Sequence, residues 1–445
     1  MAAPHPFRIA NFRAYWLSRF TGTIAVSAMS IVLGWQVYNL ARETMDVRQA
    51  AFMLGMIGFA QFVPLFLLTP ITGLVADSVD RRWIVRGTTA LLVATAALLW
   101  LLTWSGHLSL PALFAAAVAF GVARAFSGPA YSALAPNLVP RESLPTAIAV
   151  SSIAWQVGTI AGPSVGGLLY AIHPEVAYGV ATILFSVALG FMFLIGPVPQ
   201  PPAQADHRPL ARIMDGFRYV RNNRLVLAAI TLDLFAVLLA GATSLLPVYA
   251  RDILRVGSQG LGVLAAGMGI GAAITAIWFS FRPMHSNVGV KMLIAVVVFG
   301  LSILTFGLAT SITDAIGLGS GTIAGLPVHP AFIISLLALV TAGGADMVSV
   351  YVRQSLIQLH TPDAMRGRVS AVSQLTISAS NELGEFESGV MASLLGPVGA
   401  VVFGGVGAIA VTLAWARLFP ELGRARTFDP PDMLETEPEH GEAKP

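Results

Sequence analysis

Long apolar runs, separated by short segments rich in Gly, Pro and charged residues, make up most of this 445-residue chain. A helix that crosses a bilayer needs about 20 consecutive apolar residues, and twelve runs reach that length. Only 11% of the residues are charged, whereas soluble proteins have about 25%. The pattern excludes an ordinary soluble enzyme and a disordered chain, and it predicts an all-α integral membrane protein. The expected transmembrane helices lie near 14–40, 50–70, 83–104, 110–132, 146–171, 176–196, 225–249, 260–281, 289–310, 331–352, 369–395 and 398–419.

The distribution of positive charge indicates how these helices are oriented. With both termini on the inner side, the inner loops and helix ends hold 21 of the 26 Lys and Arg residues. Only Arg42, Arg48, Arg251 and Arg255 lie outside, and Arg124 lies within a span. Inner loops of membrane proteins carry an excess of Lys and Arg. We therefore expect a multi-pass membrane protein with both termini in the cytoplasm.

The chain also contains an internal repeat. An offset of 222 residues places Gly121 on Gly343 and Gly162 on Gly384, and it makes Arg124 the counterpart of Asp346. Such repeats are typical of transporters that bind their substrate between two halves. The predicted fold is therefore two pseudo-symmetric six-helix bundles around a central cavity. The expected divisions are a first bundle at 1–196, a cytoplasmic linker with an amphipathic helix at 197–224, a second bundle at 225–420 and a disordered cytoplasmic tail at 421–445.

Three motifs in the first half combine glycines with charges or a proline. The loop after the second span carries Gly73, Asp77, Asp80, Arg81 and Arg82. An acid and two bases in a tight inner turn can lock the two halves together, near Arg366 and Arg368 of the matching loop. Helix four contains Arg124 four residues before Gly128. Helix five contains a run that predicts close helix contacts and a bend, and its members are Gly158, Gly162, Pro163, Gly166 and Gly167.

These motifs resemble those of the major facilitator superfamily, and the resemblance covers about residues 11–420. The loop is similar to the family's G-x-L-a-D-r-x-G-r-R motif, with Asp80 where a glycine is usual. The helix-five run matches the family's G-x-x-x-G-P-x-x-G-G motif, which is associated with antiporters that export their substrate. Segments of the second half resemble a branch that contains enterobactin (siderophore) exporters and drug and macrolide efflux pumps. Those segments are 246–252, 344–350, 362–369 and 381–389.

Five acidic residues lie within the predicted spans, all in the second half: Asp233, Asp346, Glu382, Glu385 and Glu387. A charged side chain at the bilayer centre costs about 2.5–3.5 kcal/mol even on the most lenient scale, so such residues usually have a function. One central arginine, Arg124, cannot neutralise all five. Because burial disfavours the charged form of a carboxyl group, we expect some of them to be protonated during part of a transport cycle.

The periodicity of helix eleven predicts which acids face the cavity. At about 100° per residue, one polar stripe runs along this helix, with Glu382 at its edge and Glu387 pointing away. A matching stripe on helix five includes Gln156. We expect Glu385, and next Glu382, to line the cavity. A hydrogen-bonded brace between helices is the alternative for all of these acids, above all for Asp233 and Glu387. The stripe on helix eleven consists of Gln374, Ser378, Asn381, Glu385 and Ser388.

Several classes of chemistry are absent from the sequence. There are no cysteines, and the eight histidines are scattered through loops, tails and span edges without metal-ligand spacing on a helix. No phosphate-binding G-x-x-x-x-G-K-[ST] loop is present. We therefore expect no metal, no cofactor and no direct use of ATP.

The function predicted from these features is secondary active export. The chain is expected to move a siderophore, a drug or another small amphipathic molecule outward in exchange for protons, by alternating access. Its expected partners are the lipid bilayer, the small-molecule substrate and protons, with no nucleic acid, and the protein is expected to be monomeric. A proton-coupled importer on the same fold is the first alternative. A membrane-embedded lipid-modifying enzyme would need clustered His, Asp or Ser, and a non-transporting sensor would lack the intramembrane charges.

Overall fold

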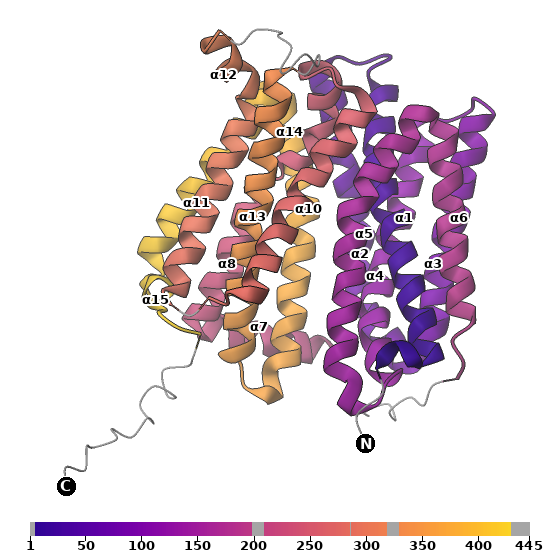
Figure 1. Ribbon diagram of the computed structural model, residues 1–445, viewed down its shortest axis with the longest axis vertical. Coiled ribbons are helices and arrows are strands. Elements are labelled where there is room, and N and C mark those ends of the chain that lie inside the picture. Colours follow the sequence, from indigo (N-terminus) through magenta and orange to yellow (C-terminus); the bar gives the residue numbers. More distant parts are fainter. Residues whose placement is uncertain (1–4, 198–208, 285, 318–328, 429–445) are drawn as a thin grey trace.

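The computed structural model describes residues 5–197, 209–284, 286–317 and 329–428. Within these residues every regular element is a helix (Figure 1). The first half contains α1 (Ala10–Ala41), α2 (Val47–Ser78), α3 (Arg81–Trp104), α4 (Leu110–Leu134), α5 (Leu144–Ile172) and α6 (Pro174–Phe193). The rest contains α7 (Pro209–Asn222), α8 (Arg224–Leu239), α9 (Leu246–Val248), α10 (Gly257–Phe281), α11 (Val288–Gly307), α12 (Ala309–Ala315), α13 (Pro330–Leu359), α14 (Asp363–Leu418) and α15 (Pro420–Arg424).

Eleven helices in the described residues are long and apolar enough to cross a membrane. The last of them, at Met365–Leu418, has 54 residues. An α-helix rises about 1.5 Å per residue, so this length is more than twice the bilayer core of about 30 Å. Gly396 divides it with a φ of 79°, and Pro397 follows. The chain therefore turns back at Gly396, and the structure confirms the prediction of twelve crossings.

The predicted continuous helix at 225–249 is wrong, because α8 ends at Leu239. Short 3-10, α and π turns replace it between Ala242 and Ile253. Two features cause the break. Pro247 lacks the N–H that a helix interior needs. At Gly241 an added Cβ would lie only 2.6 Å from the backbone carbonyl carbon of Gly384 in α14, so the two chains touch there without side chains.

Two groups of helices lie side by side (Figure 1). In the first half α1 packs on α5 and α6, α3 packs on α4 and α6, and α2 packs on α4. In the second half α10 and α11 pack on α13, while α8 and α11 pack on α14. The halves meet through two extensive contacts, α2 with α14 and α5 with α10. Residues from both halves therefore face one another along the middle of the molecule.

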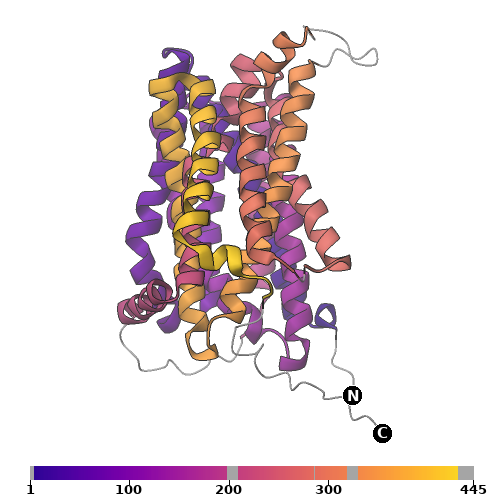
Figure 2. The same cartoon turned by 90° about the vertical axis from the view of Figure 1, so that its left-hand side faces the viewer.

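The described chain begins and ends at one end of the bundle, which we call the near end; the opposite end is the far end (Figure 1). Helix α7 lies crosswise at the near end, where it packs on α14, α8 and α2 (Figure 2). The helix predicted within the linker is therefore present. Residues 198–208 of the predicted linker lie outside the described part. The predicted tail at 421–445 begins too early: α15 is ordered because Leu422 is fully buried, and Glu421 pairs with Arg224 at 2.6 Å.

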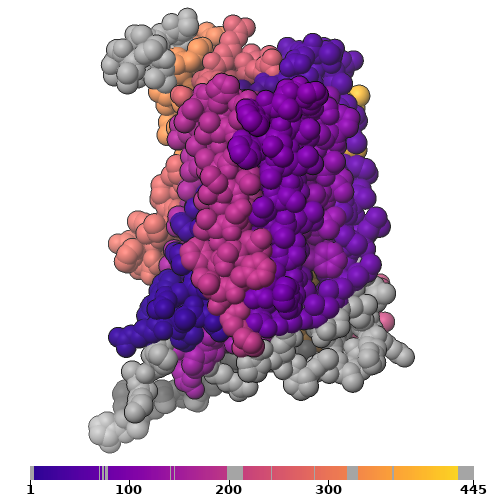
Figure 3. Space-filling view, turned by 90° about the vertical axis from the view of Figure 1, so that its right-hand side faces the viewer, coloured from indigo at the N-terminus to yellow at the C-terminus, as the bar shows by residue number. Residues whose placement is uncertain are grey.

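The outer surface of the first half is apolar. α3 and α6 form the face that points away from the second half (Figure 3). Large hydrophobic side chains are exposed on it, among them Trp83, Trp100, Trp104, Ile183 and Phe193. Soluble monomers rarely expose apolar patches of this extent, so this face suits contact with lipid chains.

Candidate functional site

A cavity of about 300 Å³ lies at the middle of the molecule, between the two halves. Helices α4, α8, α10, α11, α13 and α14 and the break after α8 contribute to its walls. The wall is apolar except for one guanidinium, three carboxylates and two neutral polar side chains. Its residues are Arg124, Val237, Ala240, Gly241, Thr243, Met268, Phe299, Asp346, Asn381, Glu382 and Glu385.

Arg124 of α4 and Glu382 of α14 form an ion pair that connects the two halves. The Glu382 side chain is almost fully buried, while 40% of the Arg124 side chain remains exposed toward the cavity. The sequence placed Asp346 opposite Arg124. Both residues do line the cavity, but the partner of Arg124 is Glu382.

Glu385 lies about one helical turn beyond Glu382 and faces α2. An added Cβ at Gly58 of α2 would lie 2.6 Å from the Cβ of Glu385 and 3.0 Å from its Oε2. The glycine therefore provides the space that this carboxyl group occupies. Among the described residues, no hydrogen bond or ion pair holds the Glu385 carboxylate. The cavity thus has one paired acid and, next to it, one acid without a counterion of its own.

The remaining polar residues predicted for helices five and eleven lie in different places. Asn381 is exposed and lines the cavity. Gln374 is also exposed, about two turns nearer the near end, and Gln156 of α5 is partly exposed; neither belongs to the wall of this cavity. Glu387 does not line it either, as the angular argument predicted.

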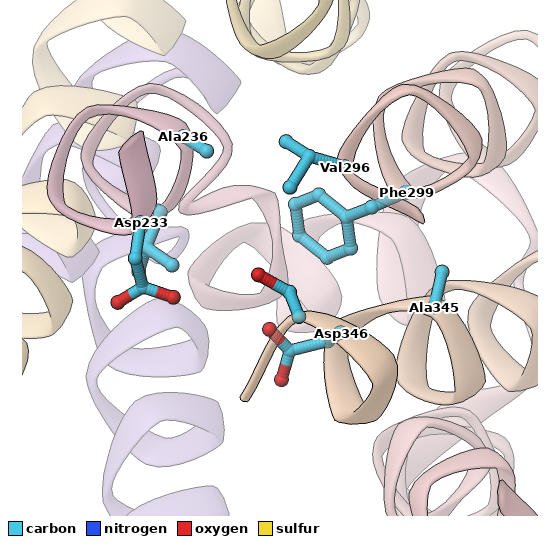
Figure 4. Close-up of a pocket in the computed structure, with 8 residues that line it drawn as sticks. Asp233, Ala236, Val296, Phe299, Ala345 and Asp346 are labelled. Atoms are coloured by element: carbon cyan, nitrogen blue, oxygen red, sulfur yellow. The ribbon is translucent and has the colours of Figure 1, made fainter. Parts of the chain in front are cut away.

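A second, much smaller pocket of about 10 Å³ lies inside the second half (Figure 4). Asp233 of α8 and Asp346 of α13 lie around it, with Val296 and Phe299 of α11 nearby. Asp346 also lines the central cavity. Arg353 pairs with Asp233 at 3.0 Å, and both side chains are almost completely buried.

Sequence reasoning missed Arg353. The predicted helix at 331–352 ends too early, since α13 continues to Leu359. The conclusion that Arg124 is the one central arginine available to the five acids is therefore wrong, because Arg353 pairs with Asp233. A signal was available: Arg353 follows Asp346 by seven residues, which is two helical turns on one face, and apolar Val352, Leu356 and Ile357 continue the buried side of the helix.

The glycines of helix five are positions of close helix contact. Added Cβ atoms at Gly158, Gly162 and Gly166 would collide with Thr23, Ser27 and Ala28 of α1. At Gly167 an added Cβ would lie 2.8 Å from Cα of Gly262 in α10, and Pro163 lies inside the helix between these contacts. The motif therefore packs α5 on α1 within its own half and on α10 of the other half.

The loop motif forms a shorter turn than the sequence predicted. Gly73 and Asp77 lie within α2, and the Asp77 side chain is outside the described part. Only Val79 and Asp80 separate α2 from α3. The arginines bond locally: Arg81 donates to Ala133 O at 3.2 Å and Arg82 to Ile195 O at 3.2 Å. Arg366 donates to Gln358 O at 3.1 Å, and Arg368 pairs with Asp215 of α7 at 3.1 Å.

Polar contacts also join the halves at the far end. Tyr38 donates a hydrogen bond to the Asp252 carboxylate, and Arg42 lies 3.4 Å from the same group. Arg251 donates to Asn39 Oδ1 at 2.6 Å. We call these five residues the far-end clasp. Together with the α5–α10 contact, in which Ser164 donates to Gly262 O at 3.3 Å, the far-end clasp holds the two halves together at the far end.

No group of three or more His, Asp or Glu side chains in the described part of the chain has a metal-binding arrangement. The site is therefore built from charges, a few neutral polar groups and apolar walls.

Known proteins are similar to this chain in sequence and in architecture. The chain matches the family described as transmembrane secretion effector over residues 1–433. It is 25% identical to the enterobactin exporter EntS of Escherichia coli (strain SMS-3-5 / SECEC) over 426 residues, which cover 95% of this chain and 94% of the relative. EntS of Escherichia fergusonii is also 25% identical, over 423 residues and 94% of both chains.

Solved structures share the fold. The D-xylose-proton symporter superimposes with a TM-score of 0.67 at 13% identity, covering 93% of this chain and 98% of that one. The nucleoside transporter NupG gives a TM-score of 0.66 at 15% identity, covering 92% and 99%. Over nearly its whole length, then, this multi-pass membrane protein belongs to the transmembrane secretion effector family, and it is a transporter of the major facilitator type rather than an enzyme.

Proposed function

We propose that this transporter exports a small amphipathic molecule across the bacterial inner membrane in exchange for protons. The observation that carries the proposal is the unpaired carboxyl group of Glu385, beside the Arg124–Glu382 pair in the wall of the cavity. A proton and a positively charged substrate group would compete for this one carboxylate. Exchange follows when each of them can bind only after the other has left.

The charge of the cavity bears on the substrate. Three carboxylates and one guanidinium line it, and Glu382 already holds that guanidinium. An amphipathic cation therefore finds both a counterion and apolar walls, whereas an anion meets an excess of acids. The relatives are exporters of enterobactin by name, so a siderophore is the other candidate. We favour an organic cation because the group that would hold an anionic siderophore is already paired.

The direction of transport rests on two supports. The helix-five motif is present in full, and the matching relatives are named exporters. With both termini in the cytoplasm, the near end is the inner side, and the far-end clasp closes the outer side. One charge that crosses about 150 mV releases about 3.5 kcal/mol, which supports a substrate gradient of a few hundredfold, at about 1.4 kcal/mol per tenfold.

Alternating access would move two units. We propose that residues 1–196 and 225–420 rock as two bodies about the cavity, joined by α7 and its flanking linker, in a monomer. Gly55 of α2 and Gly389 of α14 touch where the halves meet: an added Cβ at Gly55 would lie 2.7 Å from Cα of Gly389. Such a contact lets two helices roll on one another without side chains in the way.

Proton release on ligand binding tests the exchange. Rhodamine 6G, a cationic dye, is added to the purified protein in weakly buffered detergent, and released protons are followed with a pH indicator. We expect about one proton per bound dye in the unmodified protein and none in Glu385→Gln. Glu142→Gln, which changes an exposed acid on the short 3-10 turn Arg141–Ser143, serves as the control and should release protons normally. Dye binding without proton release in the unmodified protein would overturn the exchange.

Dye accumulation in cells tests the direction. Cells that lack their main efflux pumps and express this transporter should accumulate less dye than cells with the empty vector. The difference should vanish when an uncoupler removes the proton gradient. Increased accumulation would instead identify an importer.

A further inference from the structure

The small pocket inside the second half encloses more negative than positive charge. Asp233 of α8 and Asp346 of α13 both line it (Figure 4), and Arg353 pairs with Asp233. In the described residues no hydrogen bond or ion pair holds the Asp346 carboxylate. A buried carboxylate without a partner is costly, so the pocket must gain one positive charge when both acids are ionised.

No other helix packed against α13 at this depth supplies that charge. α10 carries no charged residue, and α11 carries only Lys291, in its first turn at the near end. The other charged groups that face Asp346 are Arg124, Glu382 and Glu385 across the central cavity. Arg124 is already paired with Glu382.

The size and lining of the pocket point to the missing charge. Its volume of about 10 Å³ is close to the smallest space that holds one water molecule, roughly 10–15 Å³. Ca²⁺ and Mg²⁺ take about six or more oxygen ligands, whereas the side chains here offer two carboxyl groups and the Ser349 hydroxyl. A proton, alone or with one water, fits this space.

Two buried polar atoms lack partners beside the acids. The Ser349 hydroxyl and Arg353 Nε have no hydrogen-bond partner among the described residues, and both side chains are almost fully buried. The hydroxyl is placed to bind a water in the pocket. The spare N–H lets Arg353 bond a second acid, so Asp233 and Asp346 can compete for one guanidinium.

We propose that this pocket is a proton-binding site distinct from the Arg124–Glu382–Glu385 cluster, in which Asp233 and Asp346 share Arg353 and one proton. Asp346 carries the proton while Arg353 is bonded to Asp233. The proton leaves when Arg353 turns toward Asp346. Because Asp346 also lines the central cavity, the site exchanges protons with the substrate passage. The coupling role of this site rests on the proposed antiport, whereas its proton binding does not.

Infrared spectroscopy of the purified full-length protein, without substrate, tests the site. The C=O stretch of protonated carboxylic acids is followed during a pH titration in H₂O and D₂O. Asp346→Asn should remove the signal of one buried protonated carboxyl group, and Glu142→Gln should leave that signal unchanged. Asp346→Glu keeps an acid at this position and should retain the signal with a different release pH, which keeps the test valid if the Asn variant does not fold.

A pair of variants separates proton sharing from simple burial. In Asp233→Asn the guanidinium is free to bond Asp346, so the carboxyl signal should disappear at a lower pH than in the unmodified protein. In Asp233→Asn combined with Arg353→Gln no cation remains, so the signal should persist to a pH higher by about one unit or more, a tenfold change in proton affinity. Removing both partners of a buried ion pair is tolerated better than removing one.

The site is overturned if Asp346→Asn leaves the carboxyl signal unchanged, or if the single and double variants shift the release pH in the same direction. Neither result affects the dye-linked proton release assigned to Glu385. Conversely, if the dye does not release protons through Glu385, the titration of Asp346 without ligand is unaffected and still tests the proton-binding site.

Discussion

Asp80 stands where the loop motif of the superfamily usually has a glycine, and its contacts explain the difference. Its φ of −56° is open to any residue, so the turn does not require glycine. The carboxylate accepts a hydrogen bond from the backbone N–H of Arg82 at 2.9 Å and therefore caps α3. It also binds the Arg82 guanidinium at 2.5 Å. One side chain thus ends the turn, begins the next helix and orients an arginine of the motif.

Replacing Asp80 should separate these roles. Asp80→Gly removes the cap, which costs a few tenths of a kcal/mol, and the ion pair, so the free energy of unfolding should fall by roughly 0.5–1 kcal/mol in all. Asp80→Asn keeps a capping oxygen and should lose less. The hydrogen bond from Arg82 lowers the pKa of Asp80 below its ordinary value of 3.8. The ion pair therefore stabilises the protein fully above that pH and loses its effect as the pH falls through the lowered pKa. Denaturant unfolding in detergent, followed by tryptophan fluorescence, measures the free energy of unfolding of both proteins. The difference between the unmodified protein and Asp80→Asn should shrink in acid. A difference that does not change with pH would contradict a role of the ion pair.

Single residues also mark what the sequence could predict about the site. Glu382, Glu385 and Asp346 were found because acids are rare within apolar runs. The pairing of Arg124 with Glu382 rather than Asp346 was not predictable, because the repeat aligns backbone positions and says nothing about the reach of a side chain. Arg353 was missed because a positive charge near a helix end is usually solvated at the membrane surface.

At the scale of helices, glycines decide how closely the halves approach. α5 and α10 touch at Gly167 and Gly262, where an added Cβ on Gly167 would lie 2.6 Å from Ser258 O. The spacing of the glycines predicted that helix five makes close helix contacts, but it did not predict which helix Gly167 touches. The sequence did not predict the break after α8, because a proline and a glycine within an apolar run are common in membrane helices, and only the closeness of α14 shows that the helix must open there.

A single added methyl group should test the α5–α10 contact. Gly167→Ala forces the two helices apart and should reduce the fraction of molecules that are closed at the far end. Gly190→Ala on α6 is the matched control, because an added Cβ there meets nothing within 4 Å. The control should raise the free energy of unfolding by roughly 0.5–1 kcal/mol, since alanine favours helix over glycine. Cysteine cross-linking between α5 and α10 measures the separation of the two helices. Equal cross-linking in both variants would show that the added methyl group at Gly167 does not separate them, and it would contradict the prediction.

At the scale of the whole molecule, apolar run lengths and loop charges were enough to predict the twelve crossings, while the family was predicted from the resemblance of the motifs. They could not predict which end of the cavity is closed, because the two conformations of a transporter have one sequence and differ by only a few kcal/mol. The clasp of Tyr38, Asn39, Arg42, Arg251 and Asp252 supplies that information. Its first three members and its last two lie more than 200 residues apart along the chain, so no local pattern connects the two groups.

Breaking the clasp should shift the whole molecule toward a state that is open at the far end. Asp252→Asn removes the charge that Tyr38 and Arg42 share, and a change of about 1.4 kcal/mol would lower the ratio of closed to open molecules tenfold. Because the Arg42–Asp252 pair is partly exposed, higher salt should act in the same direction. The chain has no cysteines, so spin labels at Thr44→Cys and Gln259→Cys report the far-end distance without background. Asp314→Asn, an exposed acid on α12 at the same end, should leave that distance unchanged. If Asp252→Asn also leaves this distance unchanged, helix packing between α2 and α14 and between α5 and α10 is sufficient to close the far end. The clasp then forms as a result of closure and does not stabilise it.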